Sequence, residues 1–391
     1  MSVMSRSEGL PSEFYVITIS KMLSSFAVNS FAVFYLWEII SHYHSVFLSG
    51  LIVTLYLLTE LSLSLLVGHL IDRFNSTRLN LLGSFIMLVG LPPLISGVHL
   101  ASIYVSAVIL MSGATLKLDS YSAIIKKHLQ EESYKRANTL NFVVNSISSI
   151  GSTAIGGAFI ILAPHLFPAA LLIMIAISLL TSIQLKEQAS SNKDTFNSEF
   201  SRVLSFMKKI SGLLIIALFI NGLFISLETY SSGLFYLILK SSPFYYTLFA
   251  AAVPAGSVPG ALLANRGAFR NDSPSIIASM VLSFSPIILL IALSPIAIAD
   301  VIAAFVLGIV LPIINIPIIT KMMKLVPAEI YGKAMASIRI FTAGSSPAMG
   351  AIFSTLALYF SIRAVLTSVG ILVIPLALYS VRVLGNFFRE V

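Results

Sequence analysis

The chain has 391 residues, of which 57% are hydrophobic and only 10% are charged, and its net charge is +8. Soluble domains carry roughly 25% charged residues, so this composition excludes an ordinary soluble globular domain. The chain contains no cysteine, which excludes disulfides, thiol catalysis and thiolate metal sites. Its six histidines form no metal-binding motif, and we therefore expect neither a metal nor a cofactor.

Long apolar segments dominate the chain from end to end. A transmembrane helix needs about 20 consecutive apolar residues, and segments of this kind predict spans over 14–38, 46–67, 79–98, 101–124, 139–162, 166–184, 211–238, 244–264, 274–293, 296–319, 334–358 and 362–384. We expect an all-α integral membrane protein of about twelve transmembrane helices. The short connections leave no room for a soluble catalytic domain, so we do not expect an enzyme.

The basic residues are distributed unevenly between the connections. With the N-terminus inside, 19 of the 24 Lys and Arg fall in inner loops and tails, two fall in outer loops and three lie within spans. The positive-inside rule then places both termini in the cytoplasm and the protein in the cell membrane. This distribution explains the positive charge without a nucleic-acid partner.

The sequence divides into two halves. A polar stretch over 185–209 follows six predicted spans and precedes six more, so we predict an N-terminal bundle over 1–184, a flexible cytoplasmic linker over 185–209 and a C-terminal bundle over 210–391. The segment 119–138 recurs in outline at 315–334. Because each half holds an even number of spans, the two six-helix bundles are predicted to be parallel repeats related by a pseudo-two-fold axis.

A charged turn is predicted over 68–78, between the second and third spans. Burying its charged side chains in hydrocarbon would cost several kcal/mol each, so the turn must lie at a membrane face. A weaker copy at 260–270 lacks the acidic residue. The residues that distinguish these two segments are Gly68, Asp72, Arg73, Arg78, Gly260 and Arg266.

Three acidic residues lie within predicted spans, namely Glu60, Asp119 and Glu228. Ionisable groups inside a membrane are costly and usually functional. Burial in general disfavours the charged form of a carboxyl group, so such a group can take up and release a proton. We predict that these three residues couple transport to protons. The alternatives are a structurally neutralised Glu60, a buried Asp119 paired with a cation, and an outer-gate contact for Glu228.

Two further acidic residues, Glu38 and Asp300, lie near the predicted outer ends of their spans, where we expect them to meet headgroups or water.

Other polar side chains recur at helical spacing within spans. The candidates for a central cavity or a substrate contact are Lys21, Asn29, Lys117, Asn141, Asn145, Asn221, Asn315 and Arg339. Lys21 could instead extend to the cytoplasmic surface, Arg339 could offset a buried acid, and the span-five asparagines could bond to neighbouring helices.

Three dispersed motifs resemble the major facilitator superfamily. The turn with Gly68, Asp72 and Arg73 resembles its signature loop, and the segments 132–138 and 326–333 resemble loops of the macrolide-efflux and siderophore-exporter branch. The resemblance implies a two-bundle transporter that works by alternating access, with the fourth helix lining the cavity. It also implies that the turn over 68–78 and its copy at 260–270 form a cytoplasmic gating loop, in which Asp72 and its arginines latch the bundles together.

The chain departs from this resemblance on its fifth helix. The antiporter-associated glycine–proline pattern is replaced there by a run ending in Gly156 and Gly157, and its counterpart on the eleventh helix contains Pro347 and Gly350. Small residues let helices approach closely, so these four positions are predicted helix-packing residues.

The chain has no GxxxxGK[ST] phosphate-binding loop, so we expect an ion gradient to drive transport. The predicted function is proton-coupled export of a small organic solute. A passive facilitator and a proton symporter that imports a metabolite are the alternatives, and a membrane-embedded sensor or enzyme is a weaker one. We expect lipid, the solute and protons as partners, no nucleic acid, and a monomer.

Overall fold

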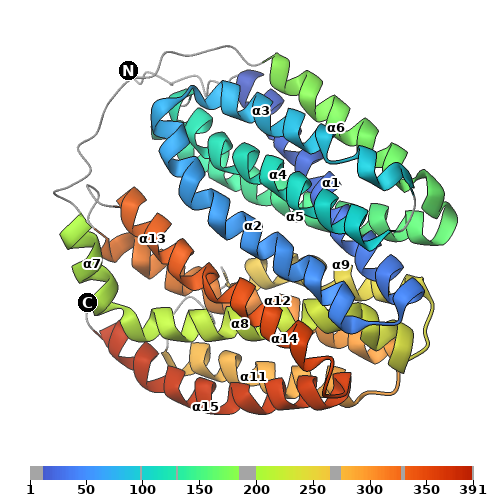
Figure 1. Cartoon of the computed structure of the whole chain (residues 1–391). Helices are drawn as coiled ribbons and strands as arrows, with labels where there is room; N and C mark the ends of the chain where they lie inside the picture. Colours follow the sequence, from blue (N-terminus) through green and yellow to red (C-terminus); the bar gives the residue numbers. More distant parts are fainter. Residues whose placement is uncertain are drawn as a thin grey trace, which may run out of the picture. The chain divides into compact units, whose positions relative to one another are not determined.

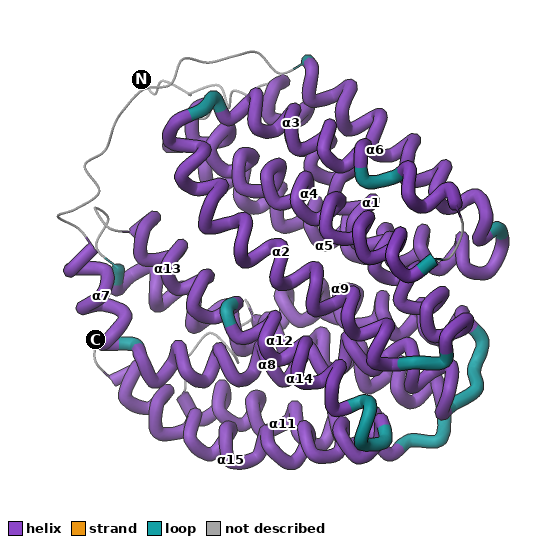
Figure 2. Tube along the Cα trace, in the orientation of Figure 1, coloured by secondary structure: helices purple, strands orange, loops and turns teal. Residues whose placement is uncertain are grey.

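The computed structural model describes residues 12–96, 99–128, 131–184, 200–264, 274–326 and 331–389. Within these ranges the regular elements are all helical and no strand occurs (Figures 1 and 2). The helices of the first half are α1 (Ser12–Tyr43), α2 (Val46–Arg73), α3 (Ser76–Val89), α4 (Leu100–His128), α5 (Glu131–Leu162) and α6 (Phe167–Ile183). Those that follow are α7 (Phe200–Lys209), α8 (Ser211–Gly233), α9 (Pro243–Ala264), α11 (Pro274–Leu293), α12 (Ala297–Leu325), α13 (Tyr331–Ala343), α14 (Ser345–Leu356) and α15 (Ile362–Arg389).

The all-α membrane fold is confirmed. Eleven helical segments of the described chain are long and apolar enough to cross a membrane, and each coincides with a predicted span. A short π-helical turn, η3 (Leu234–Ile238), continues α8 to the end of its span. The remaining predicted span, 334–358, is divided between α13 and α14, neither of which is long enough alone.

The break between α13 and α14 has a cause in the sequence. A proline cannot donate a backbone hydrogen bond to the residue four positions earlier, and for Pro347 that residue is Ala343, where α13 ends. Gly344 makes only a short turn, in which its amide donates to the carbonyl of Phe341 at 3.3 Å. The periodicity of apolar residues runs through this break, so it predicts one helix where there are two.

The predicted charged turn over 68–78 is also different in the structure. Helix α2 continues to Arg73, and the amide of Phe74 still donates to the carbonyl of Leu70 at 2.7 Å. Asn75 then caps α3 by accepting a hydrogen bond from the amide of Thr77 at 2.9 Å. The turn is therefore only two residues long, because charged residues end an apolar span without ending its helix.

The chain folds into two compact units. The first contains Met1–Asn29, Ser62–Ser152 and His165–Lys193, and the second contains Ser30–Leu61, Thr153–Pro164 and Asp194–Val391. Helices α1, α2 and α5 therefore each contribute residues to both units. The bundles over 1–184 and 210–391 stay a prediction. Of the predicted linker over 185–209, residues 200–209 form helix α7, and 185–199 lie outside the described residues.

Close packing in the second unit depends on glycine. A Cβ atom at Gly308 of α12 or at Gly256 of α9 would collide with the backbone of the other helix, and a Cβ at Gly260 would lie 2.8 Å from the Cα of Ile309. Gly260, a candidate for the gating loop, thus lies inside α9 at a helix–helix contact. Arg266 of the same candidate loop lies outside the described residues.

Candidate functional site

The second unit brings two of the predicted acids together. Glu60 on α2 is half-buried and Glu228 on α8 is exposed, and the two carboxyl groups interact electrostatically. Tyr56 of α2 and Tyr246 of α9 also lie within electrostatic range of Glu228. An exposed carboxyl group within a span would be costly against lipid. The exposed carboxyl group of Glu228 is therefore a candidate for contact with water or a solute.

An aromatic cluster lies next to this acid pair. The ring of Trp37 on α1 stacks on the ring of Tyr246 with 5.3 Å between the centroids, and it meets the ring of Tyr236 edge-on at 5.5 Å. The Tyr246 hydroxyl donates a hydrogen bond to the carbonyl oxygen of Val33 at 3.2 Å. Trp37 and Tyr246 are both buried. The cluster thereby joins α1 to η3 and α9.

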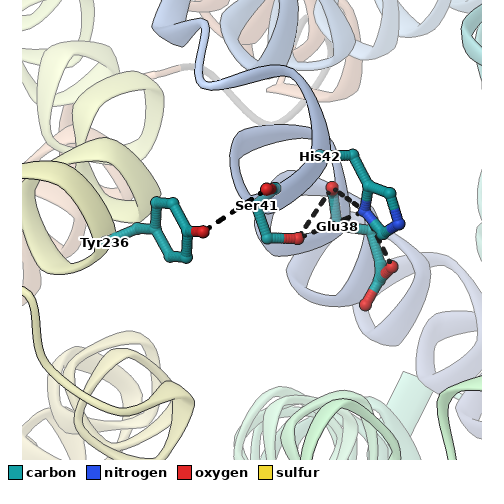
Figure 3. Close-up of polar contacts among 4 residues, drawn as sticks. All are labelled: Glu38, Ser41, His42 and Tyr236. Atoms are coloured by element: carbon teal, nitrogen blue, oxygen red, sulfur yellow. Dashed lines mark hydrogen bonds and ion pairs between the residues drawn. The ribbon is translucent and has the colours of Figure 1, made fainter.

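Figure 3 shows the end of α1 that the charge distribution places on the outer side. The hydroxyl of Tyr236 donates to the carbonyl oxygen of Ser41 at 3.4 Å, and the Nδ1 atom of His42 lies 3.5 Å from the Glu38 carboxylate. Glu38 is only 8% exposed. The expectation that Glu38 meets headgroups or water is therefore wrong, because its side chain is buried beside His42, which lies one helical turn away and is itself exposed.

Small residues allow α1, α2 and α5 to contact other helices of this unit closely. A Cβ atom at Gly50 of α2 would lie 2.5 Å from Ser354 Oγ on α14 and 2.7 Å from Thr229 Cγ2 on α8. Thr54, one turn further along α2, shares a 3.5 Å hydrogen bond with Ser354. Any larger side chain at position 50 would push α2 away from both helices.

The predicted packing residues lie at similar contacts. A Cβ at Gly350 would lie 3.0 Å from Thr54 Oγ1, and one at Gly156 would lie 2.9 Å from the carbonyl oxygen of Ser30. Gly157 faces Thr247 of α9 so closely that an added Cβ would collide with it. Pro347 is buried in the first turn of α14.

Asn221 of α8 lies beside the break between α13 and α14. Its Nδ2 atom donates to the carbonyl oxygen of Thr342 at 3.5 Å, and the hydroxyl of Ser345 donates to the carbonyl oxygen of Leu218 at 2.7 Å. Non-helical backbone at membrane depth is tolerated where protein or a water-filled cavity surrounds it. Asn221 is exposed despite this bond, so it remains accessible to a solute.

Lys117 on α4 lies inside the first unit and is only 1% exposed. Its ammonium nitrogen, which carries three N–H donors, lies within hydrogen-bond distance of four serine hydroxyls of α1, α3 and α6, at 2.9 Å from Ser20, 2.5 Å from Ser84, 2.6 Å from Ser178 and 3.1 Å from Ser182. These hydroxyls bond in turn to backbone carbonyls and to one another. The ammonium charge is thus solvated by protein oxygens, and the structure places Lys117 away from any surface a substrate could reach.

The other candidates in the first unit have different surroundings. Lys21 is buried, and its ammonium group lies 4.4 Å from the centre of the Tyr121 ring, a cation–π contact. Asp119 is half-buried, whereas Asn29 and Asn145 are exposed. Asp119 belongs to the first unit, whereas Glu60 and Glu228 belong to the second.

For several candidates the structure describes the backbone but not the side chain. Asn141 lies in α5, Arg339 in α13, and Gly68, Asp72 and Arg73 in the last turns of α2, all outside the described side chains. Arg78 of α3 and Asn315 of α12 are exposed. Within the described part of the chain, no group of three or more His, Asp and Glu residues could hold a metal ion.

Asp300, at the start of α12, is completely buried, so the expectation that it meets headgroups or water is wrong. Arg363 at the start of α15 interacts electrostatically with its carboxyl group. Arg363 also donates through Nη2 to the carbonyl oxygen of Ser294 at 3.1 Å. The buried acid of α12 thus lies within electrostatic range of a half-buried cation on α15.

Sequence reasoning missed the serine cluster and the aromatic cluster. The serines had a usable signal, since Ser20 and Ser24 on α1 repeat at the same four-residue spacing as Ser178 and Ser182 on α6. The aromatic cluster had a weaker one. Trp37 is the single tryptophan of a chain that also has 26 phenylalanines and 14 tyrosines, so aromatic residue type alone does not distinguish its partners.

Most of the chain matches a known protein family. A family model described as Major Facilitator Superfamily matches residues 17–351, and no curated protein matches the chain. The solved nucleoside transporter NupG is 13% identical, with 97% of this chain and 99% of that chain covered and a TM-score of 0.72. The peptide transporter POT in complex with sulfate is 14% identical, with coverages of 98% and 96% and a TM-score of 0.74. A bacterial homologue of the human lysosomal transporter Spinster, in an inward-facing and unoccupied conformation, is 13% identical, with coverages of 98% and 99% and a TM-score of 0.72.

Proposed function

Because the chain belongs to the Major Facilitator Superfamily, we propose that this multi-pass membrane protein is a secondary transporter that moves a small organic solute by alternating access. The observation that carries the proposal is the Glu60–Glu228 pair, in which an exposed carboxyl group within one span interacts with a half-buried one from another. Intramembrane acids of this kind mark solute or proton pathways.

Protons are the proposed coupling ion. Two carboxyl groups within electrostatic range repel each other when both are charged, and one bound proton removes this repulsion. A solute or a conformational change that alters the surroundings of Glu228 would then release or take up that proton. Asp119, in the other unit, is a second candidate for coupling but does not belong to the pair.

The contacts of α1 with α9 and of α2 with α8 and α14 are the proposed outer gate. They comprise the stack of Trp37 on Tyr246 and the small-residue contact at Gly50. All lie towards the ends of the helices that the charge distribution places outside. For the cavity to open to that side, α2 must separate from α8 and α14, and the stack must break.

The solute class is a proposal that rests on likeness. Structures of the same fold include a nucleoside transporter and a peptide transporter, and the sequence motifs resemble exporters of macrolides and siderophores. Nucleosides, peptides and macrolides are therefore the first solutes to test. Export is the direction that the resemblance favours.

Uptake into proteoliposomes with an imposed pH gradient tests the proposal. The wild-type protein should accumulate a transported solute only when the gradient is present. Glu60→Gln and Glu228→Gln should still exchange labelled for unlabelled solute but should no longer respond to the gradient.

Glu38→Gln is the matched control, because Glu38 lies in the same unit but pairs with His42. It should keep gradient-driven accumulation. If the wild-type protein equilibrates solute equally well without a gradient, the protein is a passive facilitator. If both pair variants accumulate solute as the wild type does, coupling through Glu60 and Glu228 is wrong.

A further inference from the structure

A cavity of about 350 Å³ lies where the start of α8 meets the ends of α12 and α15, all within the second unit. Its lining includes Lys209, Gly212, Tyr379, Arg382, Asn386 and Phe387. Lys209 lies two residues before the span 211–238, and the α15 residues lie in the last turns of the span 362–388. The cavity is therefore at a boundary between membrane and water, on the side predicted to be cytoplasmic. Figure 1 shows α7 and the ends of α8 and α15 gathered in this region.

The cavity is positively charged. Lys209 and Arg382 both line it, and none of the described residues that line it is acidic. No hydrogen bond or ion pair engages the Arg382 guanidinium group within the described part of the chain. Asn386, also in the lining, adds an amide group that can donate to an oxygen ligand. Two cations in the lining of one cavity favour an anion that lies between them, and arginine binds phosphate oxygens in bidentate fashion.

The walls of the cavity are held in place by packing. A third cation, Lys321 at the end of α12, lies with its ammonium group 5.4 Å and 4.8 Å from the ring centres of Phe387 and Phe388. A Cβ at Gly212 would lie 3.1 Å from Val383, so the missing side chain lets α15 approach the start of α8. Tyr379 presents an aromatic ring with a hydroxyl group, a residue type enriched at membrane interfaces.

Apolar surface leads away from the cavity along both helices. On α15, Leu378, Ile374 and Ile371 precede Arg382 at three- and four-residue spacing and are 63%, 39% and 54% exposed. On α8, Ile215 and Phe219 are 41% and 50% exposed. Residues at this spacing lie on one face of a helix. A ligand with a charged head and long apolar chains matches this arrangement, because its chains can lie on these faces while its head occupies the cavity.

The helix before the cavity has the same two-sided character. Val203 of α7 packs in a small core with Val326 and Ala334, and Phe206 and Met207 pack against it. The opposite side of α7 exposes basic residues, among them Lys208. Amphipathic helices with a basic polar face lie in the interfacial plane of anionic membranes.

We propose that the cavity lined by Lys209 and Arg382 binds the phosphate headgroup of an anionic phospholipid. The acyl chains lie along the exposed apolar faces of α15 and α8. The site is separate from the Glu60–Glu228 pair, and the proposal does not depend on which solute the protein transports. The same cations would also attract free phosphate, so the test must separate a lipid from its headgroup.

Native mass spectrometry of the detergent-purified full-length protein, titrated with phosphatidylglycerol or with phosphatidylcholine of identical chains, tests the proposal. A cation close to an anionic lipid surface contributes about a fivefold increase in affinity. The wild-type protein should therefore bind phosphatidylglycerol about 25-fold more tightly than phosphatidylcholine. Glycerol 3-phosphate, which has the headgroup chemistry without the chains, should not displace the bound lipid at the lipid's own concentration.

The double variant Lys209→Gln, Arg382→Gln should lose this preference while binding phosphatidylcholine as the wild type does. Lys208→Gln is the matched control, since Lys208 is adjacent, exposed and absent from the lining, and it should keep the preference. Equal affinity of the wild type for the two lipids would overturn the proposal. So would an undiminished preference in the double variant, an equal loss in Lys208→Gln, or full displacement by glycerol 3-phosphate.

Discussion

Replacing Gly50 with alanine should shift the protein towards the conformation in which its predicted outer side is open. The new methyl group would lie 2.5 Å from Ser354 Oγ and 2.7 Å from Thr229 Cγ2. Both of these residues are completely buried, so neither side chain can turn out of the way into open space. Helix α2 must therefore move away from α8 and α14.

The size of the effect follows from the distances. Ordinary van der Waals contact begins at 3.4 Å, so α2 would have to move by nearly 1 Å to accommodate the methyl group. Overpacking of this kind costs about 1–3 kcal/mol. The cost falls on the closed conformation alone, which corresponds to about a 5- to 150-fold change in the ratio of closed to open protein. The gain in helix propensity applies to both conformations and cancels.

Cysteine labelling measures this ratio. The chain has no native cysteine, so Ser232→Cys on α8 introduces a single reactive thiol. Ser232 is completely buried and its hydroxyl makes no hydrogen bond within the described residues, so the substitution removes no interaction. A membrane-impermeant maleimide added from outside should label this thiol faster when Gly50 is alanine.

Gly385→Ala on α15 is the matched control. A Cβ added at Gly385 meets no atom within 4 Å, so this variant should label at the rate of the Ser232→Cys parent. An unchanged or slower rate in Gly50→Ala would show that the contact of α2 with α8 and α14 does not form a closed outer gate.

Three further predictions concern packing in the two units. Trp37→Ala, which removes the stack between α1 and α9, should also accelerate external labelling of a cysteine on α8, because Trp→Ala changes in a core cost about 3–5 kcal/mol; an unchanged rate would exclude the aromatic cluster from the gate. Ser178→Ala should lower the free energy of unfolding in detergent by about 1–3 kcal/mol, because the buried ammonium group loses an acceptor. Lys117→Met should cost less than Ser178→Ala, since the serine hydroxyls can still bond to backbone carbonyls, and the reverse order would contradict this role of the serines. Arg363→Met should cost about 1–3 kcal/mol, because buried Asp300 loses the attraction of a nearby cation at an effective dielectric constant of about 20; thermal unfolding should show that Asp300→Asn recovers part of the loss in the double variant, and no recovery would show that the two groups are not coupled.

Apolar length alone predicted the membrane fold well. Eleven helical segments coincide with predicted spans, because about 20 apolar residues in a row have few structures available other than a transmembrane helix. Where the prediction differs, local chemistry decided the outcome. Pro347 interrupts a continuous apolar pattern, and the charges after Val67 end the apolar span without ending the backbone hydrogen bonds of α2.

The candidate site was only partly predictable. The sequence identified Glu60 and Glu228 as intramembrane acids, yet nothing in it shows that α2 and α8 bring them within electrostatic range. Lys117 illustrates the opposite case. Its position within a span suggested a cavity, whereas serines from three other helices surround it. Such long-range contacts depend on how helices pack, and helical periodicity carries no information about them.

Coupling of solute movement to protons through the Glu60–Glu228 pair is the core of the proposed mechanism. It can be tested by recording the pH inside proteoliposomes with a trapped dye while a transported solute is added outside, with no imposed gradient. We expect that solute entry drives protons out and raises the internal pH, and that Glu228→Gln exchanges solute without any pH change. A fall in internal pH would make the protein a symporter, and solute entry without any pH change in the wild type would contradict proton coupling altogether.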